Sequence, residues 1–117
     1  MMAQQATKEN QEREIALLDG FDYVAVPANS AAMPLGAGGG ASGDTLSHLL
    51  ITPLNTSPGP VSIKDGDGAA ITVFAGGANS LGQLVPFPVS LGGKSASGPW
   101  KITTGANVQA VAFGRFA

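Results

Sequence analysis

From Phe21 onward, hydrophobic residues tend to alternate with polar or small ones, which is the period of a β-strand. Gly, Pro, Asp and Asn interrupt this pattern at short intervals, as turn residues do between antiparallel strands. About seven short strands with no helix after residue 20 are typical of an antiparallel β-sandwich or barrel. We therefore predict an all-β fold, a jelly-roll-like antiparallel β-sandwich over residues 21–117. The predicted strands are residues 21–26, 45–52, 60–64, 69–75, 81–91, 99–104 and 108–113.

Two of these strands alternate clearly enough to predict which side chains face the core. We expect Val61 and Ile63 to point inward from one strand, and Trp100 and Ile102 from another. Residues 65–68 (DGDG) predict a tight turn of the kind that joins the strands of a hairpin.

Proline and glycine restrict two other segments. Pro86 and Pro88 cannot both lie in a central strand, so residues 81–91 are predicted to form an edge strand or a bent crossing, with a turn at Gly92-Gly93. Residues 28–43 consist mainly of small residues, and we predict a long loop with too little bulk to pack.

The first twenty residues have a different pattern. Residues 7–18 (TKENQEREIALL) are good helix formers, and Gly20 suits the left-handed conformation with which helices often end. The apolar residues of this segment gather at positions 15–18. A helix of one or two turns is marginal alone in water, so these side chains must dock on the body of the protein or on a neighbour. We predict an N-terminal arm over residues 1–20 ahead of a single domain.

Charge is scarce and unevenly distributed. Asp, Glu, Lys and Arg make up 12% of the chain, about half the usual fraction in soluble proteins. Residues 1–22 hold five acids and two bases, whereas residues 68–117 hold three bases and no acid. A body with so few charges has either a surface of Ser, Thr and Gly or a surface covered by other subunits. The acidic arm either contacts a neighbour of opposite charge or serves solubility.

Several classes of protein are disfavoured by composition. Without cysteine there is no disulfide framework, thiolate zinc site or cysteine nucleophile. The polar first residues lack the pattern of a signal peptide, and no apolar run approaches the ~18 residues of a membrane helix. A net charge of −2, with the basic residues scattered, argues against nucleic-acid binding. We therefore expect neither a nucleic-acid nor a membrane partner.

Two short motifs lack the context that their chemistry needs. Residues 38–43 fit G-x-G-x-x-G, but we expect no strand before them and no helix after them to hold a dinucleotide. Asp65 and Asp67 are spaced like the start of a calcium loop, but no acid follows Asp67 to complete one. Asp65 and Asp67 are more simply explained as turn residues that cap backbone groups.

Two ring-bearing side chains also have simpler explanations. His48 lies beside Ser47 and near Asp44, but alternation along a strand is expected to place Ser47 and His48 on opposite faces, which leaves no catalytic triad. Trp100 suits either a sugar-binding platform or the core, and its alternating position favours the core. We expect no cofactor, no metal and no enzymatic activity.

The remaining role is interaction with other proteins. Obligate interfaces resemble domain cores and are depleted in charge. The apolar residues of the arm and the aromatic residue near the C-terminus are the candidate contact residues: Ile15, Leu17, Leu18, Phe21 and Phe116.

Characteristic stretches occur at residues 23–28 (YVAVPA), 44–53 (DTLSHLLITP), 56–66 (TSPGPVSIKDG), 98–105 (GPWKITTG) and 114–116 (GRF). In these stretches, and in the Gly-rich loop, the chain resembles a family of small virion proteins of tailed bacteriophages. The resemblance covers roughly residues 23–116 and leaves the arm outside.

The resemblance implies a capsid decoration (cement) protein on the surface of the virion, bound across subunits of the major capsid protein. It implies no catalytic residues. We expect a homo-oligomer, a dimer or a trimer, because shell contacts lie at symmetry positions. Two alternatives remain open: a head–tail connector or tail component, and a receptor- or glycan-binding β-sandwich with Trp100 beside residues 36–43.

Overall fold

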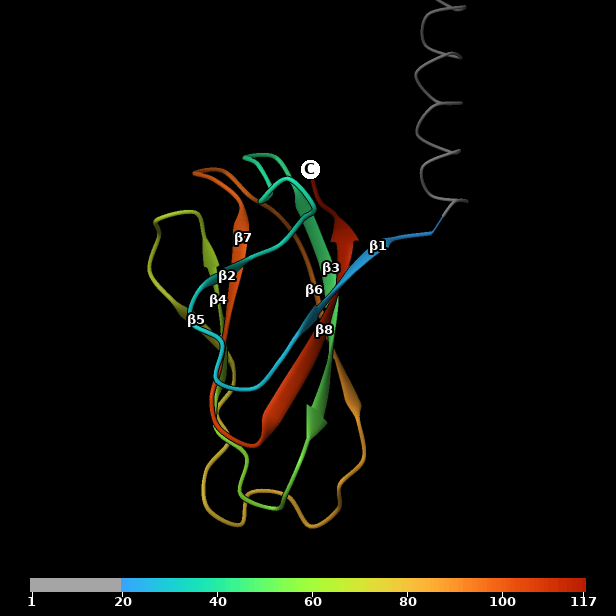
Figure 1. Ribbon diagram of the computed structural model, residues 1–117, viewed down its shortest axis with the longest axis vertical. Coiled ribbons are helices and arrows are strands. Elements are labelled where there is room, and N and C mark those ends of the chain that lie inside the picture. Colours follow the sequence, from blue (N-terminus) through green and yellow to red (C-terminus); the bar gives the residue numbers. More distant parts are fainter. Residues whose placement is uncertain (1–19) are drawn as a thin grey trace, which may run out of the picture.

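A computed structural model describes residues 20–117 of the chain (Figure 1). These residues contain eight strands in two four-stranded antiparallel sheets and no helix. The two sheets lie face to face, which confirms the predicted β-sandwich. The strands are β1 (Asp22–Val26), β2 (Met33–Pro34), β3 (Thr45–Pro53), β4 (Val61–Asp65), β5 (Ile71–Phe74), β6 (Phe87–Lys94), β7 (Trp100–Thr104) and β8 (Val108–Arg115).

The order of the strands is that of a jelly roll. One sheet has the order β1-β8-β3-β6 and the other β2-β7-β4-β5. The first strand therefore pairs with the last, the second with the seventh, the third with the sixth and the fourth with the fifth, with successive pairs in alternate sheets. This nested antiparallel pairing makes the double-sheet roll, and it brings β1 beside β8 near the C-terminus (Figure 1).

The core fills the space between the two sheets. Alternate residues of the central strands are buried, so the inward positions predicted for Val61, Ile63, Trp100 and Ile102 are confirmed. The arm predicted before residue 20 lies outside the described residues, but Gly20 itself has the expected left-handed φ of 78°. The buried apolar residues are Val26, Leu35, Leu46, Leu49, Ile51, Val61, Ile63, Trp100, Ile102, Val108, Ala110 and Ala112.

The prediction that residues 28–43 are too poor in bulk to pack is wrong at Leu35. This side chain is fully buried in the core. Its backbone N–H donates to the carbonyl of Trp100 at 2.9 Å, directly after Met33 and Pro34 pair with β7 as the two-residue strand β2. A brief pairing with β7 is enough to carry one leucine into the sandwich.

The turn predicted at Gly92-Gly93 is also wrong, because both glycines lie within β6. The register between β3 and β6 shifts near this point, and Gly92 has a left-handed φ of 74°, so the strand bulges instead of turning. Gly93 faces the core, where a Cβ atom would lie 3.2 Å from the Trp100 ring. Among the described strands β6 pairs only with β3, so the edge position expected for residues 81–91 is confirmed for residues 87–91, whereas residues 81–86 form no strand.

The Asp65 carboxylate ties the β4–β5 turn to the β6–β7 loop. It accepts hydrogen bonds from the backbone N–H groups of Ala96, at 2.9 Å, and Ser97, at 3.0 Å. These bonds, that of Ser97 first, hold the pKa of Asp65 below its usual value, because they favour the charged carboxylate. A carboxylate with a lowered pKa stabilises the fold above its unfolded-state pKa, about 3.9, and this contribution is lost as the pH falls through the folded-state pKa.

We predict that Asp65→Asn lowers the urea midpoint of unfolding at neutral pH, and that the difference from the unsubstituted protein shrinks as the pH falls below about 4. Denaturation followed by fluorescence of Trp100 at several pH values measures both effects. Asp67→Asn is the matched control. The Asp67 side chain is 99% exposed, and its only partner among the described residues is Lys101, at 3.7 Å in a surface ion pair of the kind that contributes little to stability. Equal midpoints for the two variants at neutral pH would contradict the prediction.

Candidate interaction surface

A β-bulge in β3 decides which residues reach the outer face of the β1-β8-β3-β6 sheet. Leu46 pairs with Gly114 and His48 with Phe113, so Ser47 is an extra residue relative to β8. Leu46 and Leu49 are therefore both fully buried, although three positions separate them. After the bulge, His48 and every second residue project away from the core.

The outer face carries two rows of side chains that run across all four strands. The rows follow from the cross-strand register of β1, β8, β3 and β6, and we call the surface that they form the outer face. One row is Tyr23, Phe113, His48 and Ser90, and the other is Ala25, Val111, Leu50 and Pro88.

Aromatic rings form a continuous series on this face. His48 stacks on Phe113, with ring centroids 4.7 Å apart and planes 10° from parallel. Phe21 meets the edge of His48 at 6.1 Å, and Tyr23 lies 6.4 Å from Phe113. Tyr23 is 71% exposed and Phe21 43% exposed, so much of this aromatic surface is open to solvent.

The corresponding face of the opposite sheet is polar. Thr103, Ser62 and Thr72 form one row across β7, β4 and β5. In the next row, Lys101 of β7 lies opposite Lys64 of β4. The two sides of the sandwich therefore differ in chemistry, and the apolar residues are concentrated on one of them.

No acidic side chain among residues 20–117 projects from the outer face. Asp22 accepts a hydrogen bond from the backbone N–H of Phe116, and Asp44 is buried. Asp65 caps a loop, and Asp67 pairs with Lys101 of the other sheet. Two cations, Arg115 and Lys94, lie at one end of the face, on the strands to either side of Thr45 and opposite it in register.

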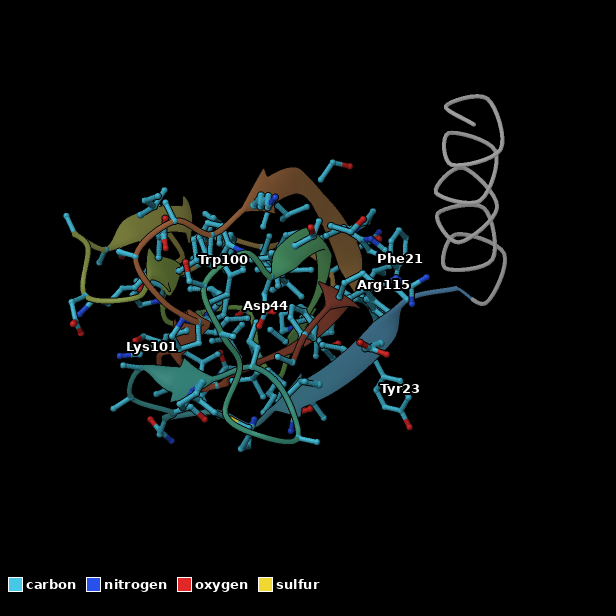
Figure 2. All side chains as sticks on the ribbon, turned by 90° about the horizontal axis from the view of Figure 1, so that it is seen from above. Phe21, Tyr23, Asp44, Trp100, Lys101 and Arg115 are labelled. Carbon is cyan, nitrogen blue, oxygen red and sulfur yellow. The ribbon has the colours of Figure 1, made fainter. Side chains whose placement is uncertain are left out.

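Arg115 lies against Phe21 (Figure 2), and its guanidinium Cζ atom is 5.5 Å from the centroid of the Phe21 ring. This distance is in the range of a cation–π contact. The Nη2 atom of Arg115 is buried, and no described residue accepts a hydrogen bond from it. The outer face thus has a cation beside its aromatic series.

The structure brings together two of the five predicted contact residues. Phe21 and Phe116 line one open hollow of about 430 Å³ beside β1. Phe116 is half-buried and also packs against the core. Ile15, Leu17 and Leu18 lie outside the described residues.

The prediction that Ser47 and His48 point to opposite faces is wrong. The bulge breaks the alternation, and the Ser47 Oγ atom lies 3.1 Å from Nδ1 of His48. The third residue of the considered triad is not in place, because the Asp44 carboxylate is bonded to the backbone N–H groups of Ala41 and Ala117. The absence of enzymatic activity stays a prediction.

Trp100 belongs to the core, as its alternating position indicates. It is 6% exposed, and its indole Nε1–H donates to the carbonyl of Asp44 at 3.0 Å (Figure 2). The same carbonyl accepts from the backbone N–H of Ser95, while the Asp44 carboxylate holds Ala41 and Ala117. Trp100 is therefore part of the bonding between the sheets and is not an exposed sugar platform.

The remaining motifs have structural roles. Residues 38–43 form a loop between β2 and β3, with no helix after it. Within residues 20–117, no three His, Cys, Asp or Glu side chains are grouped closely enough to hold a metal ion. The same residues include no helix that is long and apolar enough to cross a membrane.

Apart from Phe21, the residues that make the outer face were not among the sequence-based candidates. A signal was present in residues 108–113, where Val111 and Phe113 are apolar although they lie out of phase with the core residues Val108, Ala110 and Ala112. A strand that is apolar in both phases has two sides to cover.

Comparison of the chain with protein-family models, with curated proteins and with solved structures found no match.

We predict that Trp100→Phe lowers the free energy of unfolding by about 1–3 kcal/mol, since it removes one hydrogen bond and part of a buried ring. Trp100→Ala should lower it by about 3–5 kcal/mol. Urea denaturation monitored by circular dichroism measures both changes. An alanine variant as stable as the unsubstituted protein would show that the indole does not hold the two sheets together.

Proposed function

We propose that this chain is a structural binding protein that attaches to another protein through its outer face. The observation that carries the proposal is the pair of apolar and aromatic rows across four strands, with no acidic side chain among them. Protein interfaces are enriched in aromatic residues and arginine, and their centres are depleted in charge. Burial of such a surface contributes roughly 25 cal/mol for each Å² of apolar area removed from water.

The partner that we propose is the major capsid protein of a tailed bacteriophage, with this chain acting as a decoration (cement) protein. The resemblance of residues 23–116 to small virion proteins supports this choice. The jelly roll recurs in viral capsid proteins, and it supports the choice only as a fold-level analogy, because it also occurs in lectins. A shell has many equivalent sites, so a dimer or trimer with repeated outer faces would bind across its symmetry axes.

The two alternatives differ from cement in testable ways. A connector or tail component would be present in far fewer copies than the shell protein. A glycan-binding module built on Trp100 is disfavoured, because Trp100 is buried. Decoration is the function that we favour, because the resemblance points to it.

The first experiment is to measure the number of copies of this protein per copy of the major capsid protein in purified particles, by quantitative mass spectrometry. A ratio close to that of the shell protein would support cement. About a dozen copies or fewer would place the protein in the connector or tail, and its absence from particles would overturn a role in the virion.

We predict that Leu50→Glu and Val111→Glu each weaken particle binding at least tenfold, because a carboxylate would have to be buried in an apolar interface. Co-sedimentation of purified protein with particles that lack it measures the affinity. Ser62→Glu is the matched control, because Ser62 is half-buried in a central strand of the polar side. Thermal midpoints verify that all three variants fold. If Leu50→Glu and Val111→Glu fold and bind particles as tightly as Ser62→Glu does, the outer face is not the contact surface.

A further inference from the structure

The guanidinium group of Arg115 has no acidic partner among residues 20–117. Its Nη2 atom is buried and unbonded within them, and each of the four described acids faces elsewhere. A buried, charged N–H donor without an acceptor is unfavourable, and a carboxylate is the acceptor that stabilises it most.

The N-terminal segment carries acids close to this position. Residues 1–19 contain four acids and two bases, a net charge of −2, whereas residues 20–117 contain four of each, a net charge of zero. Asp19 precedes Phe21 by two residues, so their Cα atoms are at most about 7 Å apart. Phe21 in turn lies against Arg115. The charge and the position of Asp19 both match the missing acceptor.

The same segment carries the apolar side chains that the outer face would accept. Ile15, Leu17 and Leu18 end only three residues before Phe21, and the Cα atom of Leu18 is within about 10 Å of that of Phe21. The two rows of the outer face are about 7 Å apart along the strands. The helix of one or two turns that the sequence predicts would be about 5–11 Å long, which fits within the width of the four strands, about 14 Å.

We propose that residues 7–19 occupy the outer face of their own chain, with Asp19 bonded to Arg115 and with Ile15 and Leu18 packed on Leu50 and Val111. Attachment through Gly20 gives this segment a high effective concentration at its own face, which favours it over the segment of a second copy. The left-handed φ of Gly20, 78°, permits a sharp change of direction at the junction.

The inference deepens the proposed function and rests on its docking surface, because a partner on the outer face would have to displace the segment. The displaced segment could then contact the shell or a sister subunit. The occupied face is thus the resting state of the isolated protein.

Disulfide formation in the full chain tests the contact directly, because the protein has no native cysteine. In dilute, mildly oxidised Leu18→Cys/Leu50→Cys protein, we expect an intramolecular disulfide that forms at least ten times faster than in Leu18→Cys/Ser62→Cys, which places the second cysteine on the polar side. Non-reducing electrophoresis and intact mass separate the products. Equal rates for the two pairs would overturn the proposal, and covalent dimers from the first pair would assign the face to a second copy.

Thiol labelling provides an independent measurement. Val111→Cys should react at least five times more slowly with a small thiol reagent in the otherwise unsubstituted chain than in the Ile15→Ser/Leu18→Ser background, whereas Ser62→Cys should react equally in both. Equal protection of Val111→Cys in the two backgrounds would contradict the contact. Both experiments use the protein without particles, so their failure leaves shell binding untouched, and a failure of shell binding leaves their result intact.

Discussion

The bulge at Ser47 is the constraint on which the outer face depends. Strict alternation along residues 45–52 would place Leu46 on the same side as His48 and Leu50, opposite to Leu49. Burial of both Leu46 and Leu49 requires one extra residue in β3, and β3 gains it where its register with β8 shifts. Burial of two leucine side chains, each of which stabilises the fold by roughly 1.5–3 kcal/mol, offsets the free energy lost where one residue is left unpaired. His48 is turned outward as a result, onto the ring of Phe113.

The nested pairing of the roll then decides what surrounds that face. Because β1 pairs with β8, the point where the chain enters the domain lies beside the point where it ends, and Phe21 meets Arg115 across 94 residues of sequence. Asp44, immediately before β3, fixes the same end of the sandwich. Its carbonyl holds the Trp100 indole, and its carboxylate holds the backbone of Ala117. The aromatic face, the N-terminal junction and the C-terminal residues therefore form one connected region.

Much of this fold could be predicted from the sequence, because alternation in β4 and β7 is regular and turn residues separate the strands. Predictions failed where a local pattern was overridden by long-range pairing. Leu35 is buried because Met33 and Pro34 pair with β7, about seventy residues later, and Gly92 bulges because β6 must follow a shifted β3. The site was predicted least well. Phe21 was a candidate because it is apolar and follows the arm, but Tyr23, His48 and Phe113 become one surface only through the register of three strands.

The difference in chemistry between the outer face and the polar side of the sandwich limits what the protein can do. A monomer that relied on a polar surface for solubility would need both faces to resemble the Thr103-Ser62-Thr72 side. Instead, the body has no net charge, and the excess negative charge of the chain lies in its first nineteen residues. In the proposed function this distribution separates two roles: the body would present an apolar contact surface, and the first nineteen residues would carry the charge opposite to that of Arg115 and Lys94. A contact made by one side only also fixes the orientation of the bound protein, because the polar side must then face solvent. A one-sided sandwich is therefore suited to cover a surface, with its loops and polar sheet directed outward.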